Sequence, residues 1–541
     1  MGDAITRREL LRRGGDIGGL LAAPMLLLSH QAEASAVRST GGTPTALRPG
    51  PDVYESIGVR PLINARGTYT IISGSVMLPE VRAAMAAAAQ RYVHLDELTD
   101  AIGARLATLT GAEWGVVTSG CAAALTHASA ACVAGGNPDL HVRIPDLRGF
   151  ARDEAIVPKH SRNVYDAALR AVGLRVMEVD TLAEFEAALG PRTALVYIFA
   201  GPRADASETS LKAIAPLTRA RGVPILVDAA AEILTVPNVH LQNGATLVAY
   251  SGGKCIRGPQ TGGLLLGHKG LVRAAWVHSA PHHGFARGMK VGKEEAVAML
   301  MAVEMWAKRD HDAEWKQWTG WLDHIARRVS DVNGVTTSVV QPEGLSNHTP
   351  SLKVLWDRER LGVSGDLVAS ILLDSDPRIA LFAAGGATPS QTGVSITPYM
   401  LAAGEEKIVA DRLRAVLANP PRKDPVTEPA APAADLTGHW DVRIEYAAGT
   451  STHGLFLRQQ GNDLDGSHRG DFITRDLTGV IDGNRVRIHS AYGEDHGDSL
   501  SFSFTGTVTG DTITGTLDMG EYLAANWTGR RRAAPSTAQS Q

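Results

Sequence analysis

The sequence predicts an α/β protein with a mostly parallel sheet, followed by a separate all-β domain. From residue 54 to about residue 418, helical stretches alternate with short apolar runs, which is typical of a parallel sheet covered by helices. Residues 419–435 (NPPRKDPVTEPAAPAAD) are rich in proline and alanine, as in an extended linker. After this linker the period changes to short alternating runs between turn residues. A chain of 541 residues also needs two or three domains.

The part before the linker divides into two predicted domains. Residues 54–310 are predicted to form a large domain with an N-terminal arm, because helices and apolar strands alternate there throughout. Beyond it come a helix, short alternating strands and a last helix, so residues 311–418 predict a smaller α+β domain. In the large domain we expect helices at 78–91, 98–109, 122–134, 165–172, 211–221 and 293–308, and strands at 114–117, 194–199, 224–227, 247–250 and 263–266.

The part after the linker, residues 436–532, is predicted to be barrel-like. Its hairpin turns are marked by Gly461-Asn462, Asp482-Gly483-Asn484 and Gly510-Asp511. Repeated hairpins close most economically into a small barrel, because closure removes exposed strand edges. The alternating runs lie at 440–445, 454–459, 486–490, 500–508, 512–517 and 525–528.

The first 36 residues resemble a twin-arginine signal peptide. The sequence TRRELL at 6–11 is followed by an apolar stretch at 17–28 and by small residues suited to cleavage near residue 34 or 36. The apolar stretch is shorter than the roughly 20 residues of a membrane-spanning helix. We therefore expect a periplasmic or secreted protein without a membrane anchor after cleavage.

Charge and cysteine content exclude several classes of function. The chain has 53 basic and 57 acidic residues and a formal net charge of -4, so we expect no nucleic-acid partner. The positions of Cys121, Cys132 and Cys255 predict neither a disulfide nor a zinc site. His282 and His283 are adjacent and therefore face apart, so we expect no metal site there either.

The segment around Lys254 predicts a covalent cofactor site. An apolar strand runs into Ser251, a glycine pair and then Lys254. Glycines let the backbone approach a ligand closely, and a lysine at the end of a buried strand can form an imine with an aldehyde cofactor. The segment therefore predicts that Lys254 binds pyridoxal 5'-phosphate (PLP) and that Ser251 lies beside it. A solvated loop lysine is the alternative.

Two further segments supply what the same cofactor needs. Asp228 ends an apolar strand, where a carboxylate can pair with a protonated pyridine nitrogen. Ser119, Gly120 and Cys121 begin a helix after another strand, and the N–H groups at such a helix start receive a phosphate. Each feature alone can be an ordinary helix cap. Together with Lys254 they favour a PLP site.

Four sequences carry a resemblance to a known family. They are TSGCAAAL at 118–125, VDAAAE at 227–232, YSGGKCIRGPQTGG at 250–263 and RGMKVGKEE at 287–295. They resemble the selenocysteine-synthase-like family, which includes seryl-tRNA selenium transferase and D-glucosaminate-6-phosphate ammonia-lyase-type proteins. The resemblance covers about residues 54–417. It implies a fold-type I PLP enzyme with an aspartate-aminotransferase-like fold, in which the large domain binds the cofactor and the chain assembles as a homodimer or higher homo-oligomer.

The resemblance also assigns roles to single residues. It makes Lys254 the Schiff-base lysine and Asp228 the pyridine partner, with Ser119, Gly120 and Cys121 along the phosphate. His160 is a candidate for stacking on the ring or for proton transfer, and a polar loop histidine is the alternative. Arg257 and Arg287 are candidates for binding a phosphate or a substrate anion. The alternative is that both arginines are solvated at the surface. In the smaller domain, Arg378 is a candidate for the substrate carboxylate.

The residues allow several functions. The first hypothesis is a lyase that acts on an amino acid or amino sugar acid through a Schiff base and an α-carbanion, releasing ammonia or a β-substituent. A racemase or epimerase and an aminotransferase use the same parts. An envelope binding protein that uses the β domain beside an inactive PLP scaffold is the alternative of another class. Selenium transfer is not expected, because export separates the enzyme from charged tRNA. The chain also lacks the excess of basic residues that would favour tRNA binding.

Overall fold

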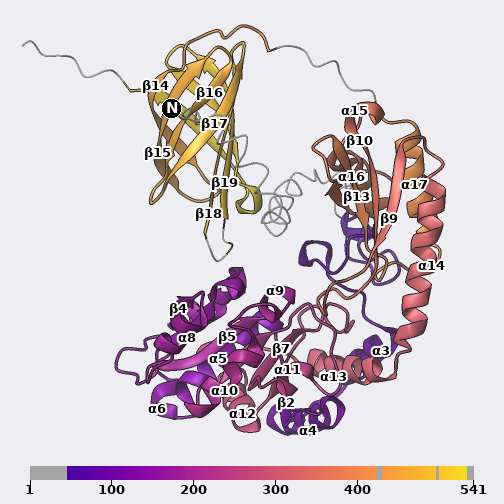
Figure 1. Cartoon of the computed structure of the whole chain (residues 1–541), viewed down its shortest axis with the longest axis vertical. Coiled ribbons are helices and arrows are strands. Elements are labelled where there is room, and N and C mark those ends of the chain that lie inside the picture. The colour runs from indigo at the N-terminus through magenta and orange to yellow at the C-terminus, as the bar shows by residue number, and fades with distance from the viewer. Residues whose placement is uncertain (1–45, 422–428, 495–496, 498, 533–541) are drawn as a thin grey trace, which may run out of the picture. The chain divides into compact units, whose positions relative to one another are not determined.

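The computed structural model describes residues 46–421, 429–494, 497 and 499–532. The predicted signal segment 1–36 and residues 422–428 of the predicted linker lie outside these ranges. The chain forms two compact units, one of residues 41–423 and one that contains residues 424–541. Figure 1 shows the first unit as helices around sheets and the second as a barrel.

A seven-stranded sheet organises the first unit. Its order is β2-β8-β7-β6-β5-β3-β4, and only β8 runs antiparallel to its neighbours. The prediction of a mostly parallel α/β sheet is therefore confirmed. The strands are β2 (Trp114–Thr118), β3 (Glu154–Pro158), β4 (Arg175–Val179), β5 (Thr193–Phe199), β6 (Ile225–Asp228), β7 (Leu247–Ser251) and β8 (Gly263–Gly267).

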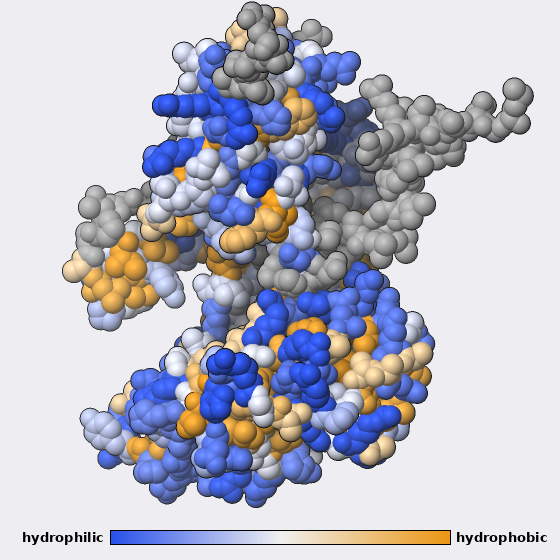
Figure 2. All heavy atoms as spheres, turned by 90° about the vertical axis from the view of Figure 1, so that its left-hand side faces the viewer, coloured by the Kyte–Doolittle hydropathy of each residue, from blue (hydrophilic) through white to orange (hydrophobic). Residues whose placement is uncertain are grey.

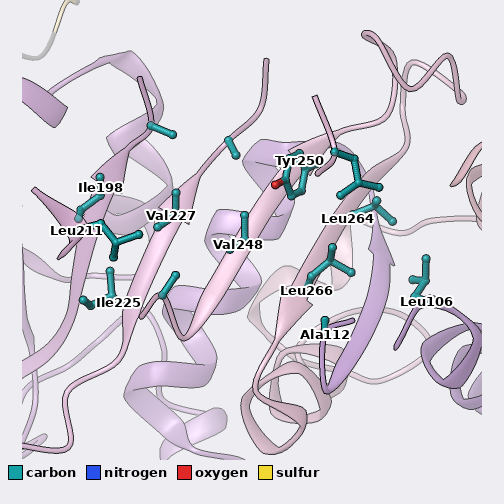
Figure 3. Packing of buried hydrophobic residues seen from close by; sticks show 14 of the residues in the cluster. Leu106, Ala112, Ile198, Leu211, Ile225, Val227, Val248, Tyr250, Leu264 and Leu266 are labelled. Carbon is teal, nitrogen blue, oxygen red and sulfur yellow. The ribbon is translucent and has the colours of Figure 1, made fainter. Parts of the chain in front are cut away.

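The central strands are apolar along their length because both faces of the sheet are buried. Figure 3 shows alternate residues of a strand, such as Ile225 and Val227 of β6, packed on one face. Helices α3 (Pro79–Ala88), α4 (Leu95–Thr110), α8 (Leu182–Ala188), α10 (Leu211–Ala220) and α13 (Lys293–Lys308) supply residues to that face, and α5 (Cys121–Ala134), α7 (Ala167–Ala171) and α12 (Lys269–Val277) to the other.

Short helices connect these elements. The predicted helix at 165–172 is a 3-10 turn followed by a short α-helix, η5 and α7, because the Asn163 side chain caps the turn at Tyr165. The 3-10 turn η5 spans Val164–Asp166. The other short helices that connect these elements are η2 (Glu55–Ile57), η3 (Thr70–Ile72), α6 (Pro138–His141), η4 (Lys159–Ser161), α9 (Pro202–Asp205), α11 (Val239–Gln242) and η6 (Phe285–Gly288).

The C-terminal part of the first unit is a small α+β subdomain. Its antiparallel sheet has the order β12-β13-β10-β9. A strand from the N-terminal arm also belongs to it, because β1 (Leu62–Asn64) pairs in parallel with β11 (Arg378–Ala380). The other elements are α14 (His311–Val329), β9 (Val335–Val340), β10 (Ser351–Asp357), α15 (Arg358–Leu361), α16 (Gly365–Asp374), β12 (Phe382–Gly385), β13 (Gln391–Ile396) and α17 (Glu405–Ala418).

The second unit is a closed barrel of eight antiparallel strands in sequential order, which confirms the predicted barrel. Inward residues such as Trp440, Leu455 and Trp527 form its core. The barrel seen in the upper part of Figure 2 has a mostly hydrophilic outer face. Its elements are β14 (Gly438–Glu445), β15 (Thr450–Gln460), β16 (Asp463–Arg469), β17 (Thr474–Asp482), β18 (Arg485–Gly493), β19 (Ser499–Thr509), β20 (Thr512–Asp518), η7 (Gly520–Tyr522) and β21 (Ala524–Arg531).

The described residues contain no helix that is both long enough and apolar enough to span a membrane. Within the same residues, no cluster of three or more His, Cys, Asp or Glu side chains is arranged to hold a metal ion. His282 instead lies 3.2 Å from Asp96 through its Nε2 atom. Cys121, Cys132 and Cys255 are free thiols.

Candidate active site

Several predicted site residues come together at one edge of the large sheet. Strands β2, β5, β6 and β7 run in the same direction, because β2 and β7 both pair antiparallel with β8. Their last residues are therefore at the same edge, which is where ligands bind in open α/β sheets. These residues are Thr118, Phe199, Asp228 and Ser251.

Asp228 is a fully enclosed carboxylate with neutral partners. It is 1% exposed, and its Oδ2 accepts a hydrogen bond from the Tyr197 hydroxyl at 2.9 Å. Its Oδ1 accepts from the Ala230 N–H at 3.0 Å and from the Cys121 thiol at 3.5 Å. Burial raises the pKa of Asp228, while these donors and the charge of Lys254 act in the opposite direction. A protonated pyridine nitrogen would supply a cation to this carboxylate.

Lys254 lies in the turn that follows β7. Its side chain is half-buried, and no hydrogen bond or ion pair to its amine is found among the residues that the structure describes. Its charge acts against the raised pKa values of Asp228 and Cys121, so the amine lies close enough to both groups to affect their ionisation. A free amine beside a buried carboxylate fits a lysine that binds an aldehyde.

The start of α5 lies against the same group of side chains. The first N–H groups of this helix have no partner within the helix, so they are available to an anion. Gly120 precedes the helix with a φ of 86°, and Ser119 is half-buried. The thiol of Cys121 contacts Asp228, so its backbone N–H is the group left for a phosphate. These residues fit the phosphate end of PLP.

Two of the glycines around Lys254 lie where the protein packs closely against itself. A Cβ on Gly252 would lie 2.3 Å from Met299 Sδ, and one on Gly263 would lie 2.4 Å from the carbonyl carbon of Gly120. These glycines therefore let the protein pack against itself, with Gly263 fitting β8 against the start of α5. That the glycines also let a ligand approach the backbone stays a prediction.

His160 reaches the site through other residues. Its Nε2 is 3.1 Å from the Thr209 hydroxyl, and its Nδ1 is 2.9 Å from the Ser161 hydroxyl. The Asn163 amide donates to the Ser161 carbonyl at 2.8 Å and to the Tyr197 hydroxyl at 3.1 Å. Burial lowers the pKa of His160, which favours a neutral ring. The histidine thus contacts Ser161, whose carbonyl is linked to Asp228 by the hydrogen bonds of Asn163 and Tyr197.

The three predicted anion-binding arginines lie in different surroundings. Arg257 has a left-handed φ of 59°, rare for a side chain of this size, and its Nε donates to the Val76 carbonyl at 2.9 Å. Arg287 is exposed at the end of η6. Arg378 donates to the Leu373 carbonyl at 2.8 Å and to the Arg60 carbonyl at 3.4 Å, so backbone groups of α16 and of the N-terminal arm use two of its donors.

A further arginine, Arg66, was not among the predicted site residues. It is 8% exposed, and its guanidinium carbon lies 4.2 Å from the centre of the Phe382 ring and 5.2 Å from that of Tyr69. Its Nε is buried without a hydrogen-bond partner. Burial lowers the pKa of Arg66, and no acid is among the causes of the shift. An arginine with this degree of burial ordinarily has an anionic partner. The burial arises from folding, so the local sequence pattern did not indicate it.

The chain is similar to several enzymes. It is 29% identical to the D-glucosaminate-6-phosphate ammonia lyase of Salmonella typhimurium over 375 residues, which are 68% of this chain and 98% of the relative. It is 32% identical to a 5'-C-glycyluridine monooxygenase-decarboxylase from Streptomyces over 302 residues, 54% of this chain and 74% of the relative. It is 25% identical to the L-seryl-tRNA(Sec) selenium transferase of Moorella thermoacetica over 345 residues, which are 56% of this chain and 66% of the relative.

A solved structure of a D-glucosaminate-6-phosphate ammonia-lyase matches the fold with a TM-score of 0.60 and 27% identity, covering 68% of this chain and 98% of that chain. No protein-family model matches the sequence. The fold and these relatives define a PLP-dependent enzyme with a lyase-like function. Within that class, the chain belongs to the selenocysteine-synthase-like family of fold type I.

Proposed function

We propose that the protein is a lyase that releases ammonia from an amino acid or an amino sugar acid. The observation that carries this proposal is the position of buried Asp228 beside Lys254 and the start of α5. PLP, when bound, supplies an electron sink for negative charge at the α-carbon of the substrate. The relative matched over 98% of its length is named an ammonia lyase, which supports elimination as the reaction.

Each residue then has a defined task. The Asp228 carboxylate keeps the ring nitrogen protonated, and the Tyr197 hydroxyl and the Ala230 N–H hold that carboxylate in place. Ser119, Gly120 and the N–H of Cys121 hold the phosphate, with Ser251 beside the ring. The Lys254 amine removes the α-proton of the substrate. The Lys254 amine, protonated by that step, is the group that can return a proton to the product. His160 is held neutral by burial, so it is the candidate for stacking on the ring.

We assign the carboxylate of the substrate to Arg66. The segment that follows Arg66 lies against the lysine turn, because the Ser75 N–H donates to the Gly253 carbonyl at 3.1 Å. The rings of Phe382 and Tyr69 hold the guanidinium, and no protein acid competes for it within the described part of the chain. Arg257 and Arg287 remain candidates for a second anionic group, such as a phosphate on a sugar acid.

Proton exchange tests this function directly. The PLP-loaded protein is incubated in D₂O with L- and D-amino acids and with D-glucosaminate-6-phosphate, and α-deuterium, ammonia and keto acid are measured. We expect ammonia and keto acid in equal amounts with wild type and neither with Lys254→Ala. Formation of the enantiomer without ammonia would identify a racemase instead. In a parallel assay with an added keto acid, transfer of the amino group to that keto acid would identify an aminotransferase.

Oxidative decarboxylation is a second candidate, because the relative with 32% identity is named a monooxygenase-decarboxylase. This reaction consumes O₂ and releases CO₂, whereas ammonia elimination needs no oxidant. Assays with and without O₂ therefore separate the two. Ammonia release that continues unchanged under nitrogen supports the lyase, and product formation that stops under nitrogen supports the oxygenase.

Two proposals concern the setting of the enzyme. We propose a homo-oligomer, since enzymes of this kind typically assemble in that way, and light scattering of the holoenzyme tests it. We also propose export through the twin-arginine pathway, on the evidence of the sequence at 6–11. That pathway suits a protein that has folded around its cofactor before transport.

A further inference from the structure

The interior of the β-barrel carries a group of polar side chains. His453 on β15, His468 on β16, Arg475 on β17 and Ser490 on β18 are all buried, although most inward positions of the barrel are apolar. The four residues lie on four successive strands, and His468 is the register partner of Arg475. They therefore form one continuous polar patch on the inner wall.

Hydrogen bonds join the two histidines to their neighbours. His453 Nδ1 lies 2.8 Å from His468 Nε2, and His468 Nδ1 lies 2.7 Å from the Ser490 hydroxyl. The Tyr446 hydroxyl lies 3.5 Å from His453 Nε2. Burial lowers the pKa of His468 to about 3 and also lowers that of His453. Both rings are therefore neutral near pH 7, and Arg475 alone gives the patch its charge.

Arg475 has no anionic partner among the residues that the structure describes. It is 7% exposed, its guanidinium carbon lies 4.7 Å from the centre of the Phe502 ring, and its Nε and Nη1 are buried without a hydrogen-bond partner. Asp471, whose side chain is 53% exposed, lies 3.6 Å from His453 Nε2, and no described carboxylate lies within ion-pair distance of Arg475. An unpaired buried cation costs the fold free energy, so a ligand that supplies the missing charge would be bound favourably.

We propose that this part of the barrel interior is a binding site for a small monocarboxylate. Arg475 matches one negative charge, and its Nε and Nη1 donors, which lack partners, are available to the oxygens of a carboxylate. The Phe502 ring offers an apolar surface to the rest of the molecule. A phosphate dianion would bring a second negative charge that the neutral histidines do not balance. Eight-stranded barrels are of a size that can hold one small ligand.

Hydrogen exchange followed by mass spectrometry tests this site in the full-length, PLP-loaded protein. The probes are sodium benzoate, sodium acetate and inorganic phosphate, each added at an ionic strength held constant with sodium chloride. We expect benzoate or acetate to slow exchange several-fold in peptides from β15 to β18, and phosphate to have a smaller effect. No response to either carboxylate, or a stronger response to phosphate, would overturn the proposal.

Two arginine variants assign the response to its residue. Arg475→Met keeps an apolar stem and should abolish the carboxylate effect, whereas Arg469→Met, which changes an exposed arginine of β16, should keep it. Without any probe, Arg475→Met should exchange more slowly than wild type in the barrel, because an uncompensated buried charge has been removed. Faster exchange or a misfolded barrel in this variant would show that Arg475 serves the fold and would overturn the proposal.

The barrel site is independent of catalysis in the first unit. Lys254→Ala should therefore retain the full response to benzoate in the barrel peptides. A response that disappears in Lys254→Ala would place the carboxylate in the first unit and would contradict the barrel site. If the ammonia-release assay fails, the hydrogen-exchange measurement on the barrel can still be interpreted. The two proposals are therefore tested independently.

Discussion

The Tyr197 hydroxyl donates a hydrogen bond of 2.9 Å to Asp228 Oδ2, and the two residues lie on the neighbouring strands β5 and β6. Tyr197 is fully buried and is held in turn by the Asn163 amide. The carboxylate that we assign to the ring nitrogen is therefore positioned by the interior of the sheet, so its orientation does not depend on a surface loop.

Removal of this hydroxyl should weaken cofactor binding. In Tyr197→Phe the pKa of Asp228 should rise further, because one of the groups that lowers it is lost. Asp228 then becomes protonated at a higher pH, so the loss of PLP on acidification should also begin at a higher pH. We expect PLP affinity to fall about 10-fold, the effect of about 1.4 kcal/mol for one hydrogen bond.

Absorbance titration with PLP at several pH values measures this change. Tyr250→Phe is the matched control, because Tyr250 is also buried and its hydroxyl is hydrogen-bonded to the Asn238 amide instead of to Asp228. It should lose stability without a change in PLP affinity. Equal PLP affinities in wild type and Tyr197→Phe would show that the hydroxyl does not support the cofactor partner.

A methyl group at Gly263 should disturb the phosphate end of the site. The new Cβ would lie 2.4 Å from the carbonyl carbon of Gly120 and 2.8 Å from the N of Cys121, so the start of α5 has to move. Gly263→Ala should therefore bind PLP at least about 10-fold more weakly, measured by the same titration. Gly320→Ala on α14 meets no atom within 4 Å and should instead raise the stability by about 1 kcal/mol.

His127 should make the stability of the first unit depend on pH. Burial in α5 lowers the pKa of His127 to about 4, whereas an unfolded chain takes up this proton below about pH 6.5. The free energy of unfolding should therefore fall as the pH falls from about 6.5 to about 4. Between about pH 7.5 and about pH 5, wild type should lose roughly 2 kcal/mol more than His127→Leu in urea titrations. Parallel losses in the two proteins would contradict the assignment.

Arg66→Met should act on substrate binding. The loss of a charge-assisted, bidentate contact should raise KM about 100-fold and leave the cofactor spectrum unchanged. Arg378→Met is the comparison, because its donors are used by backbone carbonyls. We expect it to lose stability at an unchanged KM. A KM effect of Arg378→Met with none in Arg66→Met would return the carboxylate to the residue that the sequence analysis favoured.

Export should depend on the arginine pair at the N-terminus. Replacement of Arg7 and Arg8 by lysine should leave the protein in the cytoplasm with its PLP bound. Cell fractionation followed by blotting against the β-barrel measures the distribution. An unchanged distribution would show that residues 1–36 do not act as a twin-arginine signal.

Most of the fold could be predicted because the central strands are buried on both faces and read as apolar runs. The two strands missed in the large sheet depend on distant partners. Glu154 at the start of β3 is balanced by Arg175 and Arg192, and a local pattern does not reveal these pairs. In the barrel, β16 and β17 were missed because His468 and Arg475 occupy inward positions, which hides the alternation.

The site was predictable where the chemistry lies at the end of a strand, as for Lys254 and Asp228. The role of Tyr197 was not predicted because the residue lies inside an apolar strand, where its sequence position indicates a core residue. Arg66 was missed because its environment comes from Phe382, which is distant in the sequence. The glycines were recognised, but their packing against Met299 and Gly120 depends on elements that are brought together only by folding.

The N-terminal arm ties the two parts of the first unit together. Ala65 donates to the Ala380 carbonyl and accepts from the Thr397 N–H, both in the small subdomain, and ten residues later Ser75 donates to the turn that carries Lys254. A short segment anchored at both ends transmits displacement. A movement of the small subdomain toward the large sheet would therefore also shift the Lys254 turn. Substrate binding and the positioning of the Lys254 amine would then occur together.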